Sequence, residues 1–135
     1  MKVMKHFLSM SLVLALVFVM PSVCFAAEYD FSSVKKSVDS NSWSYIGSAT
    51  KDKAGSVGEI KVTKMYDADG NESSSYSQVY AKATGNGTSK LVTKGSWYEV
   101  AIPAASQSQG SSVGLYCQGH TPWLDCKISG YWNVH

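Results

Sequence analysis

The stretch from residue 43 to residue 135 alternates between short runs of strand-forming residues and short turn-forming segments. Ser, Thr, Tyr, Val and Ile are dense in the runs, and Gly recurs between them. The runs fall at 43–50, 58–66, 73–84, 89–94, 96–103, 112–118 and 126–134. Strands this short and this regularly spaced predict an all-β fold, namely an antiparallel β-sandwich of about seven strands.

Side chains within these runs alternate between apolar and polar, which is the pattern of a strand with one buried face. In 96–103 the pattern places Trp97 and Glu99 on one face. The residues on the opposite face are Tyr98, Val100 and Ile102. No stripe of useful length with the period of a helix follows residue 42, so the sequence predicts a single β-domain over 43–135.

The first 26 residues have the layout of a secretory signal peptide. Lys2 and Lys5 precede an apolar run from Phe7 to Met20, and Ala26 supplies a small residue at the expected cleavage position. The apolar run is shorter than the roughly 20 residues of a membrane-spanning helix. We therefore expect cleavage after Ala26, secretion into an oxidising extracellular space, and no transmembrane segment in the mature chain.

Residues 27–42 form a lead-in to the predicted β-domain. Phe31, Val34 and Val38 recur at helical spacing, whereas Ser, Lys and Asp dominate the rest of the segment. The sequence predicts either a short helix or a flexible segment here.

Lysine is the only strongly basic residue type in the chain. The sequence has 12 Lys and Arg residues against 10 Asp and Glu residues, and all of the basic ones are Lys. Lys2 and Lys5 leave with the predicted signal peptide, so the mature chain has no formal net charge. Without arginine or a basic excess, the chain lacks the surface on which nucleic-acid binding depends.

Two cysteines remain after the predicted cleavage, Cys117 and Cys126. Because secreted proteins fold under oxidising conditions, the sequence predicts a disulfide between them. The bridge would make 118–125 a rigid loop that carries His120 and Trp123. The alternative is a zinc site, although the spacing of its ligands matches no standard pattern. Those ligands would be Cys117, His120, Cys126 and His135.

A second metal site is suggested by Asp67, Asp69 and Asn71, which resemble the start of a calcium-binding loop. The pattern then requires Gly and Glu at positions that Glu72 and Gln78 occupy here. The Asp-Gly dipeptide within the segment favours a hairpin turn instead. The sequence therefore predicts no metal ion.

Few residues are available for catalysis. His120 is the one interior histidine after the predicted signal peptide, and a Ser-His-Asp relay would combine it with Asp125 and a serine. No nucleophile-elbow motif accompanies them. The carboxylates available for glycoside chemistry are Glu59, Glu72 and Glu99. We expect no catalytic site and no cofactor.

Aromatic side chains are the strongest functional feature, because exposed aromatics on a sandwich bind sugars or cell-wall polymers. Trp123 follows Pro122 in the predicted loop and is the best candidate for exposure. The other tryptophans of the mature chain, which we expect to fill the core, are Trp43, Trp97 and Trp132. The full set of candidate ligand-binding residues is Trp123, His120, Tyr116, Tyr131 and Trp132.

In its Gly, Ser, Tyr and Trp content, the segment 75–135 resembles the lactococcin-972-like bacteriocins, small secreted β-sandwich proteins of Gram-positive bacteria. The run 128–132 is also similar to the terminal motif of a family of secreted Bacillus-type proteins. The chain departs from the bacteriocins in its cysteine pair and its greater mature length. The resemblance implies a secreted, non-enzymatic protein that acts at a cell envelope.

These features predict a secreted, non-catalytic binding or effector protein, bacteriocin-like in type, whose partner is a cell-envelope component or a polysaccharide. One alternative is a secreted carbohydrate-binding or adhesive module that stacks sugars on Trp123. Another is a small secreted hydrolase that uses His120 and Asp125.

Overall fold

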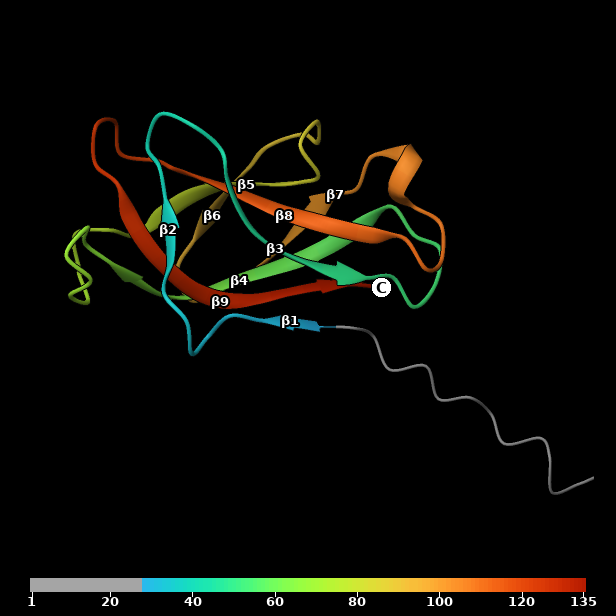
Figure 1. The fold of residues 1–135 in the computed structure, drawn as a ribbon, viewed down its shortest axis with the longest axis horizontal. Coiled ribbons are helices and arrows are strands. Elements are labelled where there is room, and N and C mark those ends of the chain that lie inside the picture. The colour runs from blue at the N-terminus through green and yellow to red at the C-terminus, as the bar shows by residue number, and fades with distance from the viewer. Residues whose placement is uncertain (1–27) are drawn as a thin grey trace, which may run out of the picture.

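The computed structural model of the protein describes residues 28–135, so the predicted signal peptide and its cleavage after Ala26 lie outside the described residues. Nine β-strands and one 3₁₀ turn at Ala104–Ser106 make up the described fold, which confirms the all-β prediction (Figure 1). The strands are β1 Glu28–Asp30, β2 Lys36–Val38, β3 Ser44–Thr50, β4 Val57–Tyr66, β5 Gln78–Ala83, β6 Lys90–Thr93, β7 Trp97–Ala101, β8 Ser112–Gly119 and β9 Cys126–Val134. Within 28–135, no helix is long and apolar enough to span a membrane.

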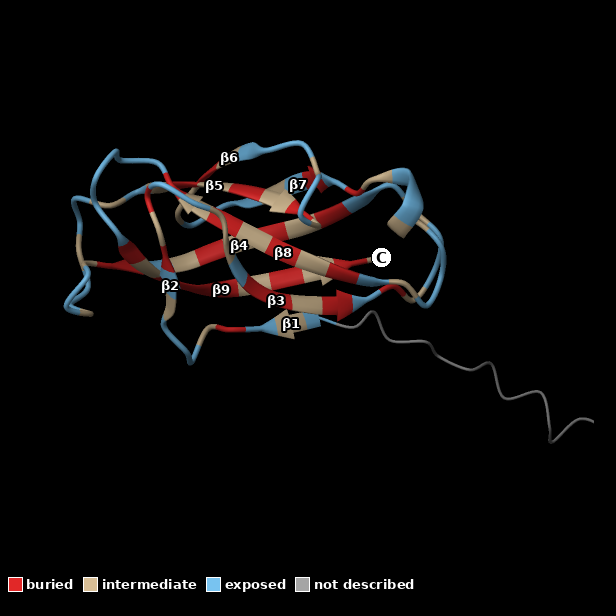
Figure 2. Cartoon of the chain, turned by 45° about the horizontal axis from the view of Figure 1, so that its top comes forward, coloured by how far each residue is buried: buried red, intermediate tan, exposed pale blue. Residues whose placement is uncertain are grey.

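The strands form two antiparallel sheets that pack face to face. The first sheet has the order β1-β9-β4-β7, and β2 also pairs with β9. The second sheet has the order β3-β8-β5-β6. Buried residues alternate with exposed or half-buried ones along most of the longer strands, as β8 shows (Figure 2). Alternation places the buried side chains on one face of each sheet. The outer faces of the two sheets are therefore separate surfaces.

Each of the seven predicted runs overlaps one of the strands β3 to β9, and β4 and β8 each extend one residue beyond the predicted run. The predicted lead-in is different, because it holds β1 and β2 in place of a helix or a flexible segment. Both short strands pair with β9. Phe31 and Val38 are buried, whereas Val34 is half exposed. A strand of three residues depends on its partner rather than on its own sequence, which is why helical spacing was misleading here.

Trp132 of β9 belongs to the core and is fully buried. Its indole Nε1 donates a hydrogen bond of 3.1 Å to the main-chain oxygen of Val113 in β8, across the two sheets. The indole packs over Gly58 of β4, where a Cβ atom would lie 2.5 Å from the ring. Gly58 is therefore required by the close approach of the ring rather than by a turn.

We expect Gly58→Ala to lower the free energy of unfolding by about 1–3 kcal/mol, because the added methyl group forces the Trp132 indole out of its position. Urea unfolding followed by tryptophan fluorescence measures the change. Gly85→Ala is the matched control, since a Cβ there meets nothing within 4 Å. Equal stability of the two variants would show that the indole can move without cost.

Candidate ligand-binding surfaces

The outer surface of the second sheet carries a pair of tyrosine rings. Tyr45 of β3, Tyr116 of β8 and Lys82 of β5 are cross-strand partners, so their side chains project from the same face. The rings of Tyr45 and Tyr116 lie 5.4 Å apart at an interplanar angle of 58°. Gly114 leaves room for both rings, because a Cβ there would lie 3.2 Å from Tyr116 and 3.3 Å from Tyr45. Tyr45 is 58% exposed.

Two further contacts extend this surface. Lys82 Nζ lies 4.3 Å from the centre of the Trp43 ring and donates a hydrogen bond of 2.6 Å to the main-chain oxygen of Gly85. The rings of Tyr80 and His120 lie 5.4 Å apart. We call this surface the tyrosine face, and its residues are Trp43, Tyr45, Tyr80, Lys82, Tyr116 and His120.

Charge is distributed unequally between the two sheets. None of the four strands of the second sheet contains Asp or Glu, and their lysines are Lys82 and Lys90. The strands of the first sheet contain both signs of charge. Their acidic residues are Glu28, Asp30, Glu59 and Glu99. The strands that carry the tyrosine face therefore contribute positively charged side chains and no negatively charged ones.

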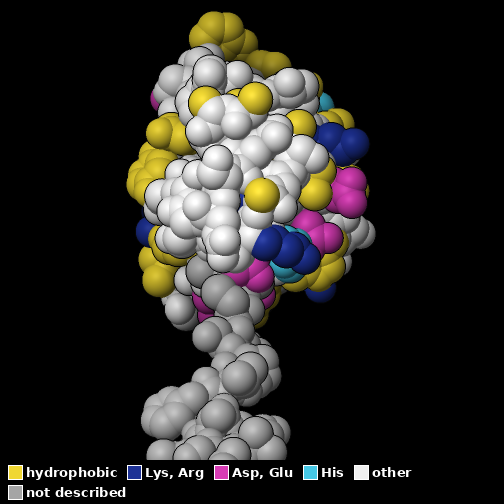
Figure 3. Space-filling model, turned by 90° about the vertical axis from the view of Figure 1, so that its right-hand side faces the viewer, with side chains coloured by type: hydrophobic (Ala, Val, Ile, Leu, Met, Phe, Trp, Pro, Cys, Tyr) yellow, Lys and Arg dark blue, Asp and Glu magenta, His cyan; other side chains and the backbone are white. Residues whose placement is uncertain are grey.

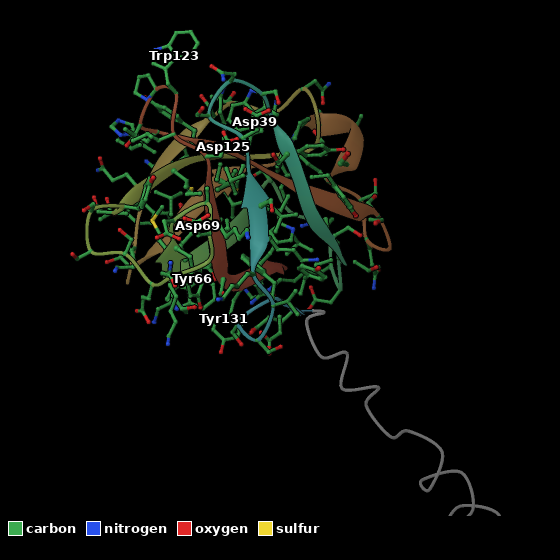
Figure 4. The ribbon with its side chains drawn as sticks, turned by 60° about the vertical axis from the view of Figure 1, so that its left-hand side comes forward. Asp39, Tyr66, Asp69, Trp123, Asp125 and Tyr131 are labelled. Carbon is green, nitrogen blue, oxygen red and sulfur yellow. The ribbon has the colours of Figure 1, made fainter. Side chains whose placement is uncertain are left out.

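Trp123 lies in the loop between β8 and β9 and points away from the sandwich (Figure 4). It is 83% exposed, more than any other large hydrophobic residue that the structure describes. Its φ of 67° is uncommon for a bulky residue and costs about 1–3 kcal/mol. The loop starts at His120, which belongs to the tyrosine face, so the exposed Trp123 lies in a segment that adjoins this face.

The remaining candidate residues lie elsewhere. Tyr131 is on the outer surface of the first sheet, where its ring lies 6.3 Å from that of Trp97. Trp132 is buried in the core and is not accessible to a ligand. The expectation that Trp43 and Trp97 fill the core is wrong, because Trp43 is half-buried outside the core and Trp97 is 46% exposed. The alternation of Trp97 and Glu99 along their strand was the signal that placed it outside.

Cys117 and Cys126 are free thiols in the structure, so the predicted disulfide is not formed. Both are buried, Cys117 on the second sheet and Cys126 on the first. Burial raises the pKa of Cys117 well above its ordinary range, with a smaller contribution from Cys126. Burial and the nearby Asp125 charge raise the pKa of Cys126 to about 11. Protonated thiols packed in a core are poor nucleophiles and poor metal ligands.

The loop that the disulfide was expected to brace is held by hydrogen bonds instead. Asp125 Oδ1 accepts a bond of 2.9 Å from the main-chain N–H of Ser40, and the N–H of Gly119 donates 2.9 Å to the main-chain oxygen of Asp39. Asp39 and Asp125 both line a cavity of about 250 Å³ at this end of the sandwich (Figure 4). Hydrogen bonds from Ser42 and Asn41 lower the pKa of Asp39. Asp39 and Asp125 therefore hold the loops at this end of the sandwich in place through hydrogen bonds.

The geometry does not assemble a hydrolytic relay from His120 and Asp125. The His120 ring lies against Tyr80, and Asp125 binds the backbone of Ser40. Across residues 28–135, no hydrogen bond joins the two side chains, and no group of three or more His, Cys, Asp or Glu residues is arranged to hold a metal ion.

The segment around Asp67 forms a hairpin turn. The N–H of Gly70 donates to the main-chain oxygen of Asp67 at 3.0 Å, and Gly70 has a φ of 92°. The Asp67 carboxylate accepts a hydrogen bond of 2.8 Å from the main-chain N–H of Asn71, and this bond lowers the pKa of Asp67. Lys35 Nζ donates to the main-chain oxygen of Gly70. The turn is thus closed by its own hydrogen bonds and capped by an ammonium group.

We expect the free energy of unfolding of the reduced protein to fall as the pH rises from about 9 to about 11, because the folded state holds the Cys126 proton more tightly than the unfolded state does. The stabilisation that the Cys126 proton supplies is complete at pH values below the ordinary thiol pKa, and it is lost as the pH rises through the raised pKa of Cys126. The slope is about 1.4 kcal/mol per pH unit for each ionising thiol. Urea unfolding in a reducing buffer measures it.

The double variant Cys117→Ala/Cys126→Ala is the control for every other group that titrates in this range. Its slope is expected to be smaller than that of the original chain by the thiol contribution. Identical slopes would mean that neither thiol is protected by the fold.

A scan against known protein families, a search of curated proteins and a search of solved structures each found no match. The resemblance of segment 75–135 to the lactococcin-972-like bacteriocins therefore stays a prediction.

Proposed function

We propose that the protein is a secreted, non-catalytic binding protein that attaches to a glycan of a cell envelope through its tyrosine face. The observation that carries this proposal is the ring pair of exposed Tyr45 and half-buried Tyr116, on a sheet whose strands contain no acidic residue.

Aromatic rings on a sheet suit the C–H faces of pyranose sugars, since they offer a large apolar area with polar groups at the rim. The phenol groups of Tyr45 and Tyr116 supply such polar groups. Tyrosine has only two side-chain torsions, so little conformational entropy is lost when it contacts a ligand. The strands hold the rings in position before binding, which lowers the free-energy cost further.

The charge of this surface favours a neutral or acidic glycan. Lys82 lies in register with Tyr116, and no carboxylate from the four strands opposes it. Its ammonium group is held over Trp43 and by Gly85, so it is ordered before a ligand arrives. A lysine contacts an anionic group as a point charge, without the paired geometry of arginine.

The exposed Trp123 supports a role for the adjoining loop in the same contact. Its positive φ places a large apolar side chain in solvent at a cost that packing within the described chain does not recover. Backbone strain of this kind clusters at ligand-binding segments. A glycan chain that extends beyond His120 would meet this indole next.

We expect the double variant Tyr45→Ala/Tyr116→Ala to bind insoluble Gram-positive cell wall about tenfold more weakly than the original chain, because two stacking faces are removed. Co-sedimentation with wall material measures the affinity. Two preparations are compared, complete wall and wall stripped of its phosphate-containing polymers by acid, to separate a neutral glycan from an anionic one.

Val34→Ala is the control, because it removes an exposed apolar side chain outside the tyrosine face. It should bind as the original chain does. The proposal fails if the original chain does not sediment with either preparation, or if the double variant keeps its full affinity while folded by circular dichroism.

A further inference from the structure

Two carboxylates stand directly opposite each other on the outer surface of the first sheet. Glu59 of β4 and Glu99 of β7 are cross-strand partners. Opposite positions on neighbouring strands have Cβ atoms about 5 Å apart, and like charges there destabilise the pair. A sequence that places two acids in this register therefore leaves a site that a cation would stabilise.

The register continues this acidic row across the sheet. Glu59 also pairs with Asn133 of β9, which in turn pairs with Glu28 of β1. His135 Nε2 lies 3.2 Å from Glu59 Oε2 and is the one basic contact of the row among residues 28–135. Lys51 donates a hydrogen bond to the main-chain oxygen of His135 and so fixes this end of β9. Glu99 has no ion pair within the described chain.

An aromatic row runs beside the acidic one. Trp97 of β7 pairs with Lys61 of β4, and Lys61 pairs with Tyr131 of β9. The Trp97 and Tyr131 rings lie 6.3 Å apart with their planes tilted by 32°. Lys61 Nζ lies 6.0 Å from the Trp97 ring centre, between the two aromatic strands. We call the surface formed by Glu59, Lys61, Trp97, Glu99, Tyr131 and Asn133 the tryptophan face.

A hollow of about 300 Å³ adjoins Glu99. Val57 and Ala101, which are cross-strand partners, supply apolar walls, and the segment before β6 supplies the hydroxyl groups of Thr88 and Ser89. Lys90, the first residue of β6, also lines the hollow and forms no ion pair with Glu99 among the described residues. The hollow thus combines a carboxylate, an ammonium group, two hydroxyl groups and apolar surface next to an aromatic platform. At the end of the molecule that faces the viewer in Figure 3, acidic side chains also gather beside histidine and lysine.

We propose that the tryptophan face is a second glycan site, specific for sugars with free amino groups, such as a β-1,4-linked glucosamine oligomer. The ammonium groups of the oligomer neutralise Glu59 and Glu99, and the pyranose rings of the oligomer stack on Trp97 and Tyr131. Strand β4 lies between the strands of Trp97 and Tyr131, so a glycan that crosses the sheet meets both rings, with Lys61 between them.

This site goes beyond the proposed function and does not require the tyrosine face to bind anything. The two faces differ in charge, since the strands behind the tyrosine face contain no acid, whereas the tryptophan face holds two opposed carboxylates. The tyrosine face carries Lys82 and no carboxylate, whereas the tryptophan face carries Glu59 and Glu99 beside Lys61. A glycan with free amines is therefore attracted more strongly to the tryptophan face than to the tyrosine face.

Binding of a glucosamine hexamer is measured by tryptophan fluorescence and calorimetry in low salt at about pH 5.5, where the sugar amines are protonated. The fully N-acetylated hexamer has the same rings without the charge. We expect the glucosamine hexamer to bind about fivefold more tightly or better. Trp97→Ala should weaken it about tenfold, and Glu99→Gln about threefold.

Glu72→Gln is the matched control, because Glu72 is an exposed carboxylate in the hairpin, paired with Lys64. It should leave the affinity unchanged. Equal affinity for the two hexamers, or equal weakening by Glu72→Gln and Glu99→Gln, would overturn the proposal. So would a loss in Tyr45→Ala/Tyr116→Ala that exceeds the loss in Trp97→Ala, because the hexamer would then bind the tyrosine face.

Discussion

The Trp132 indole is the contact on which the sandwich depends. It belongs to the central strand β9 of the first sheet, and its N–H reaches the backbone of β8 in the second. The side chain can occupy this place only because Gly58 has no Cβ in its way. A buried N–H without a partner would cost free energy, so the hydrogen bond to Val113 also fixes how the two sheets slide relative to each other. The position of one outer face relative to the other therefore depends on this contact.

The two outer faces then follow from the period of a strand. Every residue beside a core residue points outward, and the antiparallel register aligns outward residues into rows across the sheet. Tyr45, Tyr116 and Lys82 form such a row on one side, and Tyr131, Lys61 and Trp97 form one on the other. Each face therefore combines aromatic rings with charge on a rigid support. Only the tryptophan face adds carboxylates, because Glu59 and Glu99 lie beside its row.

Local pattern was sufficient to predict seven strands and the all-β class, because each of those strands carries its own alternation or turn residues. It was insufficient for β1 and β2, whose existence depends on β9. Trp97 shows where two rules conflict: its size favoured the core, while its alternation with Val100 favoured the surface, and the alternation decided. Rows such as Glu59 with Glu99 require a register, which no single segment contains. The disulfide was predicted only from the oxidising extracellular space that a secreted protein meets, whereas both thiols are free in the structure.

The pairing of Glu28 with Asn133 has a consequence for the order of folding. The first sheet joins the earliest described strand to the last one, and within the described chain β1 and β2 pair with no strand other than β9. A chain that emerges from its N-terminus must therefore hold β1, β2 and one edge of β4 without partners until residues 126–134 arrive. Contacts this distant in sequence close slowly, so the exposed strand edges have time to meet other chains. The polar residues at β1 and β2, such as Asp30 and Lys36, oppose that association during the delay.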